Sequence, residues 1–488
     1  MVKATLRSAV HLGTAAVAYL MASVPGCAEV QNVKVGGDVT VLALHRRNMD
    51  LKDNNGALDR ENYLMTTTGL NVGADLTENV SAFVRVANER DWTNQGISGE
   101  TGSDIDLSQA YVTFKELFYA PLTVKVGAQP IVWGRGFVLG GNLLPSVLST
   151  VGSGGDRNGS ITSNEFTDFT SFDAIRATLD LGGAAQIGIP LTVDYVYIKL
   201  NENLVRSADD VNLQGINLST HLDPMDSELE AYYLNKRDRS FTAEVHNHSG
   251  TVNTWGIRGS MKPVDGGLFW GELALQHGDR AVDMDGASTT VGPGSGQQGW
   301  AADFGLEYTL KDVRTTPKFG GEWIFYSGKN IEEGSVPGAG QGWDPIAPSY
   351  FPTVIRSYQT RSTVGGLYPV AETGITSAFT NQHQFALYGG LKPIDDLKLD
   401  SRLSWFVMPV AALLPTAPAG NSERKGFLGT EWDTWLTYNY TDDVQFGVTY
   451  GLFLPGAAFR EGGDGCSAAT CFGRATAQEL ISTVSVKF

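Results

Sequence analysis

Residues 444–454 read VQFGVTYGLFL, a run in which large apolar side chains alternate with small or polar ones. Such alternation over about ten residues is typical of a membrane-crossing strand, with one face toward lipid and the other toward a water-filled lumen. Residues 301–311, AADFGLEYTLK, repeat the pattern with charged side chains at inward positions. A packed soluble core would place those charges outside. Both runs therefore predict strands of a transmembrane β-barrel with a polar interior.

The same alternation recurs along the chain and predicts about 18 antiparallel strands. The predicted strands cover residues 33–46, 61–76, 79–91, 106–118, 122–132, 172–181, 192–200, 213–222, 227–236, 252–262, 267–277, 301–311, 317–327, 380–392, 398–408, 430–440, 444–454 and 476–488.

The connections between these strands alternate in length. Every second link is a tight turn rich in Pro, Asp and Gly, such as residues 263–266, and the others are long, above all 133–171 and 328–379. Outer-membrane barrels have short periplasmic turns and long extracellular loops. We therefore expect an all-β, single-domain barrel over residues 29–488 with both termini in the periplasm. A soluble sandwich is the rival, but it would not segregate its loops by length.

The N-terminus reads as a secretory signal peptide over residues 1–28. Lys3 and Arg7 form a positive start, an apolar run follows to residue 24, and Gly26 and Ala28 offer small residues for cleavage. This export signal predicts the outer membrane of a Gram-negative cell. The alternatives are a retained anchor, which the shortness of the run disfavours, and a lipoprotein acylated at Cys27.

Charge and cysteine content narrow the partners. The net charge of -17 disfavours nucleic acid, and membrane lipids with lipopolysaccharide are the expected surroundings. Cys466 and Cys471 lie close together in a chain bound for an oxidising compartment, so they predict one local disulfide. No metal and no cofactor is predicted. The last residue, Phe488, follows alternating apolar positions and looks like the signal that the barrel-assembly machinery reads; an ordinary last strand is the alternative.

Three places resemble the alginate-export family of 18-stranded outer-membrane barrels. They are the segment AYV at 110–112 leading through LTVKVGAQ at 122–129 to WGRG at 133–136, the segment FDAIR at 172–176, and the pair LGTEWD at 428–433 with YGLFLPG at 450–456. The resemblance implies a saccharide-exporting channel. Ala128 stands where the family has Arg, with Arg135 nearby, and the short link 441–443 has no room for a periplasmic plug. The acidic net charge argues against an anionic polysaccharide as cargo.

Inward positions of the predicted strands carry both charges, and rings of charge on a pore wall set selectivity. These charges could select among solutes, or they could form pairs that only stabilise the wall, and the sequence does not favour either hypothesis. Arg176 and Arg258 are the preferred selectivity residues because guanidinium groups bind carboxylate and phosphate well. We expect them, with Arg135, to face carboxylates across the lumen, and we expect loop 133–171 to narrow the channel. The candidate pore-lining residues are Arg135, Arg176, Arg258, Lys125, Lys318, Arg402, Glu272, Asp303, Glu322, Glu431 and Asp433.

The favoured function is a porin-like channel for hydrophilic solutes, possibly poly- or oligosaccharides. One alternative is an outer-membrane barrel enzyme of the lipase or protease type, although no spacing of Ser, Asp and His nominates a catalytic set. The other is a scaffold or conduit barrel. The chain is therefore predicted not to be an enzyme.

Overall fold

The computed structural model describes residues 32–49, 51, 60–92, 105–119, 121–141, 168–184, 188–201, 210–239, 250–279, 296–328, 342–350, 352–357, 380–409, 426–457 and 475–488. These residues form 18 strands: β1 Asn32–Arg47, β2 Arg60–Thr77, β3 Val80–Asp91, β4 Asp106–Phe114, β5 Leu122–Gln129, β6 Phe172–Asp180, β7 Leu191–Asn201, β8 Val211–Leu222, β9 Ser227–Asp238, β10 Gly250–Met261, β11 Gly267–Asp279, β12 Gly296–Thr309, β13 Lys318–Tyr326, β14 Gln382–Ile394, β15 Leu397–Val407, β16 Phe427–Asn439, β17 Val444–Pro455 and β18 Ala477–Lys487.

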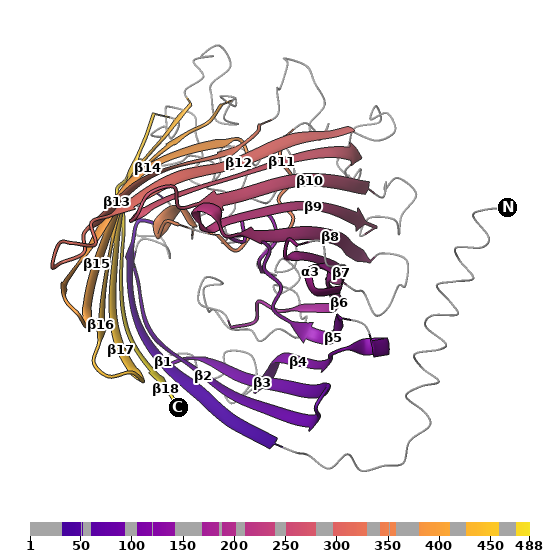
Figure 1. Ribbon diagram of the computed structural model, residues 1–488. Coiled ribbons are helices and arrows are strands. Elements are labelled where there is room, and N and C mark those ends of the chain that lie inside the picture. The colour runs from indigo at the N-terminus through magenta and orange to yellow at the C-terminus, as the bar shows by residue number, and fades with distance from the viewer. Residues whose placement is uncertain are drawn as a thin grey trace.

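The strands close into one barrel (Figure 1). Each strand pairs antiparallel with its neighbours in the sequence, and β1 also pairs with β18, with Val39 opposite Val486. Closure satisfies the backbone groups that an edge strand would expose, as lipid requires. The predicted 18-stranded antiparallel barrel is confirmed.

The two ends of the barrel differ. Short links follow β2, β4, β6, β8, β10, β12, β14 and β16, and both ends of the barrel chain, before β1 and after β18, lie on the same side as these links. Three short helices belong to these links: η1 Leu117–Tyr119, α3 Leu181–Ala184 and η4 Pro224–Asp226. We call this side the short-turn end and the opposite side the long-loop end. Among the described residues, no helix is long and apolar enough to cross a membrane.

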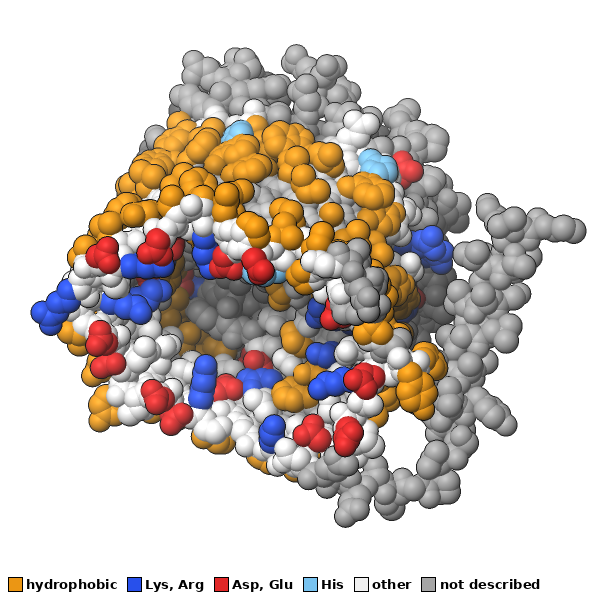
Figure 2. All heavy atoms as spheres, in the orientation of Figure 1, with side chains coloured by type: hydrophobic (Ala, Val, Ile, Leu, Met, Phe, Trp, Pro, Cys, Tyr) orange, Lys and Arg blue, Asp and Glu red, His pale blue; other side chains and the backbone are white. Residues whose placement is uncertain are grey.

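The alternation of the sequence sets the two faces of the wall. On β12, Phe304 and Leu306 are about half exposed on the outer face, whereas Asp303, directly before Phe304, is fully buried inside. On β17, Phe446 and Val448 are likewise exposed outward. Figure 2 shows hydrophobic side chains over the outer wall and charged side chains around the mouth of a hollow.

The last residue completes the seam of the barrel. The Phe488 amide donates to the Gly37 carbonyl oxygen at 2.9 Å, and the Gly37 amide donates to the Phe488 carbonyl oxygen at 2.8 Å. A role of Phe488 in recognition by the assembly machinery stays a prediction.

Two predicted strands end earlier than expected. The strand predicted over 106–118 ends at Phe114 because Glu116, Phe118 and Tyr119 adopt positive φ values in the turn. The strand predicted over 122–132 ends at Gln129, before Pro130, which has no amide hydrogen to donate to a ladder. Several predictions concern residues outside the described ones. They are the signal peptide at residues 1–28 with Cys27, the disulfide between Cys466 and Cys471, and most of both long loops.

Candidate functional site

Two connecting segments fold into the lumen. Residues 131–141 follow β5, and residues 342–350 belong to the long connection between β13 and β14. The two segments meet in a parallel bridge between Leu139 and Ala347. The Gly140 amide donates to the Ala347 carbonyl oxygen at 2.8 Å, and the Ser349 amide donates to the Gly136 carbonyl oxygen at 2.8 Å. Each segment therefore satisfies backbone groups of the other.

An apolar cluster anchors these segments to the wall. Trp133 and Phe137 from the first segment and Trp343 and Ile346 from the second are almost fully buried. They pack with inward side chains of β7, β8, β9 and β13, namely Val196, Ile198, Leu213, Leu234, Ile324 and Tyr326. The predicted polar interior therefore does not extend to this side of the lumen. Inward apolar residues occur there because the inserted segments, not water, cover them.

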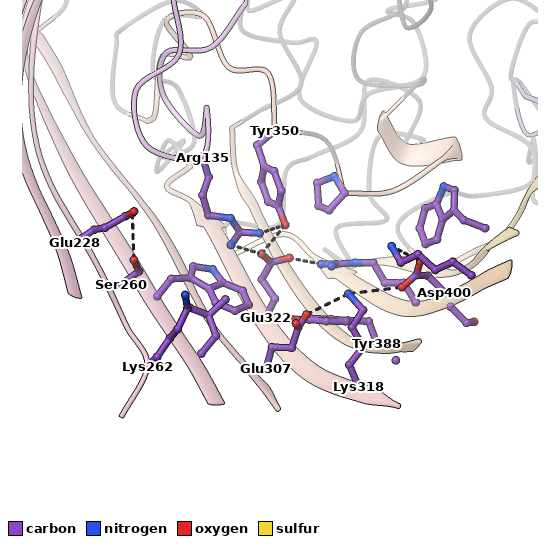
Figure 3. Close-up of a pocket in the computed structure, with 18 of the residues that line it drawn as sticks. Arg135, Glu228, Ser260, Lys262, Glu307, Lys318, Glu322, Tyr350, Tyr388 and Asp400 are labelled. Carbon is purple, nitrogen blue, oxygen red and sulfur yellow. Dashed lines mark hydrogen bonds and ion pairs between the residues drawn. The ribbon is translucent and has the colours of Figure 1, made fainter. Parts of the chain in front are cut away.

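Arg135 lies at the tip of the first segment and joins both segments to the wall (Figure 3). Its Nη1 is 3.0 Å from Glu322 Oε1 and 3.2 Å from Asp303 Oδ2, and its Nη2 donates to the Tyr350 hydroxyl at 2.6 Å. The guanidinium stacks between the Trp270 and Tyr350 rings, 4.4 and 4.3 Å from their centroids. Such planar stacking with forked hydrogen bonds suits arginine and not lysine.

A second arginine completes this arrangement. Arg402 Nη2 donates to Glu322 Oε2 at 2.5 Å, so Glu322 bridges two guanidiniums. The Tyr350 hydroxyl also donates to Glu322 Oε1, at 2.7 Å. Glu322 and Asp303 are almost fully buried, and a buried carboxylate is tolerated only when it is paired and hydrogen-bonded. We call these residues the constriction cluster, after the predicted narrowing of the channel by loop 133–171: Arg135, Trp270, Asp303, Glu322, Tyr350 and Arg402.

Gly305 allows this cluster to form. A Cβ at this position would lie 1.9 Å from Cζ2 of Trp270, so the indole lies directly against the glycine. A Gly305→Val substitution must displace Trp270 and remove the ring on which Arg135 stacks. We expect a higher single-channel conductance with the barrel still folded, because the strand ladders remain. Planar-bilayer recording checks this, with Gly321→Val as control, since a Cβ at Gly321 would lie 3.6 Å from the Ala386 carbonyl oxygen and from a methyl group of Leu387. An unchanged conductance in Gly305→Val would contradict the role of Trp270.

Arg258 and Glu272 lie side by side. They are direct partners on the adjacent strands β10 and β11. Arg258 Nη1 lies 2.6 Å from Glu230 Oε1 on β9, and the Tyr232 hydroxyl donates to Glu272 at 2.7 Å. The predicted arrangement, with arginines facing carboxylates across the lumen, is therefore wrong for these residues.

Arg176 and Lys125 occupy another part of the wall. Arg176 Nε lies 2.9 Å from Asp194 Oδ1, and Thr178 and the indole of Trp133 also donate to Asp194. Lys125 is the register partner of Arg176, and its ammonium lies 4.4 Å from the centroid of the Tyr111 ring. This group ties the base of the first inserted segment to β7.

Glu431 and Asp433 hold a different part of the long connection. Glu431 Oε1 accepts from the Ile355 amide at 2.6 Å, and Oε2 accepts from the Arg356 amide at 2.9 Å. Asp433, fully buried, follows on the same face of β16. The two carboxyl groups predicted as pore lining are thus covered by residues 352–357, which pack against Phe406 and Phe453.

A cavity of about 580 Å³ opens on the short-turn side of the constriction cluster. We call it the vestibule. The constriction cluster forms one limit, and Asp226 and Lys262 at the barrel mouth form another. Lys318 bridges its wall, 3.3 Å from Glu307 Oε2 and 3.6 Å from Asp400 Oδ1 (Figure 3). Its other lining residues include Tyr388, Trp435, Ser260, Ser401, Glu228 and Lys398.

The charges at the mouth remain ionised at neutral pH. The hydrogen bond and charge of Lys262 lower the pKa of Asp226 below its ordinary value, and Lys311 does the same for Asp265. Both pairs are exposed, so they set the local charge of the mouth rather than the stability of the barrel.

Sequence reasoning missed several lumen residues. Tyr350 lies in a loop without periodicity, and its only signal was the aromatic content of that loop. Arg46 and Glu479 form a fully buried pair, 2.9 Å apart, between β1 and β18. Both stand at inward positions of predicted strands, so the alternation could have found them.

Comparison with solved structures shows the fold. The chain is similar to Pseudomonas aeruginosa OccK9 (OpdG), with 9% identity, coverage of 94% of this chain and 99% of that chain, and a TM-score of 0.53. It is also similar to P. aeruginosa OccK5 (OpdH), with 13% identity, 94% and 98% coverage and a TM-score of 0.50. Acinetobacter baumannii OccAB2 gives 9% identity, 95% and 99% coverage and a TM-score of 0.50. At these identities the likeness concerns the barrel alone.

Comparison with curated protein sequences finds no match. The sequence pattern of one family, described as alginate export, matches residues 33–471. That range includes β1–β17 and extends the resemblance seen from residue 110 onward to the first strands. The chain therefore belongs to the alginate export family.

Proposed function

We propose that this chain is a porin-like channel of the bacterial outer membrane that passes small hydrophilic solutes. In this proposal residues 1–28 are the cleaved signal peptide, and the short-turn end faces the periplasm. The closed barrel with its outward apolar face and charged lumen supports the membrane location. Family membership supports transport.

The vestibule is the observation that carries the proposal. Its volume of about 580 Å³ lies in the range of small-ligand sites, roughly 300–1,000 Å³. Its lining combines aromatic rings with charges that already have partners, such as Lys318 with Glu307 and Asp400. Such a lining offers hydrogen bonds without a strong net charge. It suits neutral or dipolar solutes, and oligosaccharides are the finer proposal.

In this proposal, the effect of a charged wall residue on selectivity depends on where it lies along the pore. Charges in a wide aqueous pore are screened within about 8–10 Å at physiological salt. We propose that the inserted segments narrow the lumen at the constriction cluster, so we assign selectivity first to Arg135 and Arg402. Arg176 contributes mainly by holding the first inserted segment, because its partner Asp194 also accepts from Trp133, whereas Arg258 and Lys125 contact residues of the wall.

Recording from the purified protein in planar bilayers tests the function. We expect discrete conducting events with mild ion selectivity, because anions and cations are paired along the path. A neutral oligosaccharide added on the short-turn side should produce transient current blocks as it occupies the vestibule. The Arg402→Gln variant is expected to shorten these blocks while still conducting. A folded barrel that conducts no ions would refute the channel.

A further inference from the structure

The outer face of the barrel carries a basic cluster at the long-loop end of β1 and β2. Arg46 points into the lumen toward Glu479, so its neighbours His45 and Arg47 lie on the outer face, and both are exposed. Arg60 on β2 is the register partner of Arg47 and is exposed on the same face. We call His45, Arg47 and Arg60 the outer basic cluster. Arg90 on β3 is also exposed outward, but it lies opposite Thr66, farther along β2. Figure 1 shows that β18, β1, β2 and β3 are adjacent.

The depth of this cluster follows from β1. Outward positions from Val33 to Ala43 are apolar or glycine. At about 3.3 Å per residue and a tilt of about 40°, this row covers about 25 Å, the height of the apolar band of an outer-membrane barrel. His45 and Arg47 come next along the strand, so they lie just beyond the hydrocarbon. Trp92, half exposed and hydrogen-bonded to Thr66, lies on the same face, as expected of an interfacial tryptophan.

The cluster lacks compensating anions within the described part of the chain. Arg47 and Arg60 are directly opposite each other, and like charges in that relation destabilise a sheet. Among the described outward side chains of β18, β1, β2 and β3, none is acidic. A local concentration of cations in a chain of net charge -17 indicates a site for an external anion.

We propose that the outer basic cluster binds the phosphate groups of lipopolysaccharide in the outer leaflet. Guanidinium groups match phosphate oxygens with paired, charge-assisted hydrogen bonds. A phosphorylated lipid places those phosphates at the level of the cluster and its acyl chains along the apolar row of β1. A soluble phosphate would gain no such contact. The site is independent of what passes through the lumen, but it requires the long-loop end to face outward.

Native mass spectrometry of the detergent-purified full barrel tests the site. The probes are diphosphoryl lipid A, monophosphoryl lipid A and phosphatidylglycerol, titrated against the parent and the Arg47→Ser/Arg60→Ser double variant. Arg237→Ser is the matched control. Arg237 is also exposed outward near the long-loop end, but its register partners on the adjacent strands are the uncharged Asn212 and Thr251.

We expect the parent to retain diphosphoryl lipid A most strongly and phosphatidylglycerol least. The double variant should bind lipid A about a hundredfold more weakly, about tenfold for each arginine that loses a charge-assisted bond, whereas Arg237→Ser should match the parent. Binding by the double variant equal to that of the parent would overturn the proposal. An equal loss in Arg237→Ser, or equal retention of phosphatidylglycerol, would also overturn it.

Discussion

Replacing Arg135 with alanine is expected to raise the single-channel conductance several-fold and to shift the reversal potential toward cation selectivity. The guanidinium holds the first inserted segment to Glu322 and Asp303 and stacks on Trp270 and Tyr350. Removing one partner of a buried ion pair costs about 3–5 kcal/mol. Here Asp303 loses its paired cation, whereas Glu322 keeps Arg402. The segment should therefore leave its docked position for a larger fraction of time.

The selectivity shift has a separate cause. Without Arg135, Asp303 loses its paired cation and keeps the Trp270 indole as its hydrogen-bond partner within the cluster, so the lumen at the cluster becomes more negative. Bilayer recording in a salt gradient measures both effects. Lys311→Ser is the control, because Lys311 pairs with Asp265 in an exposed turn far from the cluster. If Arg135→Ala kept the parent's conductance and reversal potential, the constriction cluster would not limit conduction.

The strands could be predicted from the sequence because a membrane wall constrains every second residue. Lipid accepts only apolar side chains, so Phe304, Leu306 and Tyr308 had to alternate with Asp303, Gly305 and Glu307. Counting the alternating runs gave the strand number, and the lengths of the links gave the topology of a closed barrel. Neither step needed contacts between distant residues.

The inserted segments could not be predicted in the same way. Residues 342–350 have no periodicity, and their place depends on backbone pairing with residues 136–140. Arg135 was nominated by its position beside a family motif, and nothing in the sequence paired it with Tyr350. An apolar lumen patch such as Leu213 and Leu234 is equally invisible until the covering segments are known.

The error about opposed charges was avoidable. Hairpin register is fixed by the turn, and the short link 262–266 places Arg258 opposite Glu272. The predicted hairpin therefore already showed that Arg258 and Glu272 lie next to each other on adjacent strands. The larger lesson is that lumen charges of a barrel should first be sought among partners on adjacent strands.

Replacing Trp343 with alanine is expected to raise conductance without altering any charge at the constriction. Trp343 is 1% exposed, and its amide donates to the Ser327 carbonyl oxygen at 2.9 Å. Loss of a buried tryptophan side chain costs about 3–5 kcal/mol. Here the substitution should destabilise the docked position of residues 342–350 and not the barrel, because the strand ladders hold the wall independently of this loop.

The two variants together separate shape from charge. Trp343→Ala withdraws Tyr350 from the cluster but leaves Arg135, Asp303 and Glu322 in the chain, so its reversal potential should stay nearer the parent's than that of Arg135→Ala. Both variants should widen the path. The widening can be measured as an increase in the size of neutral polymer that enters the pore. Trp432→Ala is the matched control, since that tryptophan faces outward and is about half exposed. A conductance rise in the control equal to that in Trp343→Ala would mean that barrel damage, not release of the inserted segment, opens the channel.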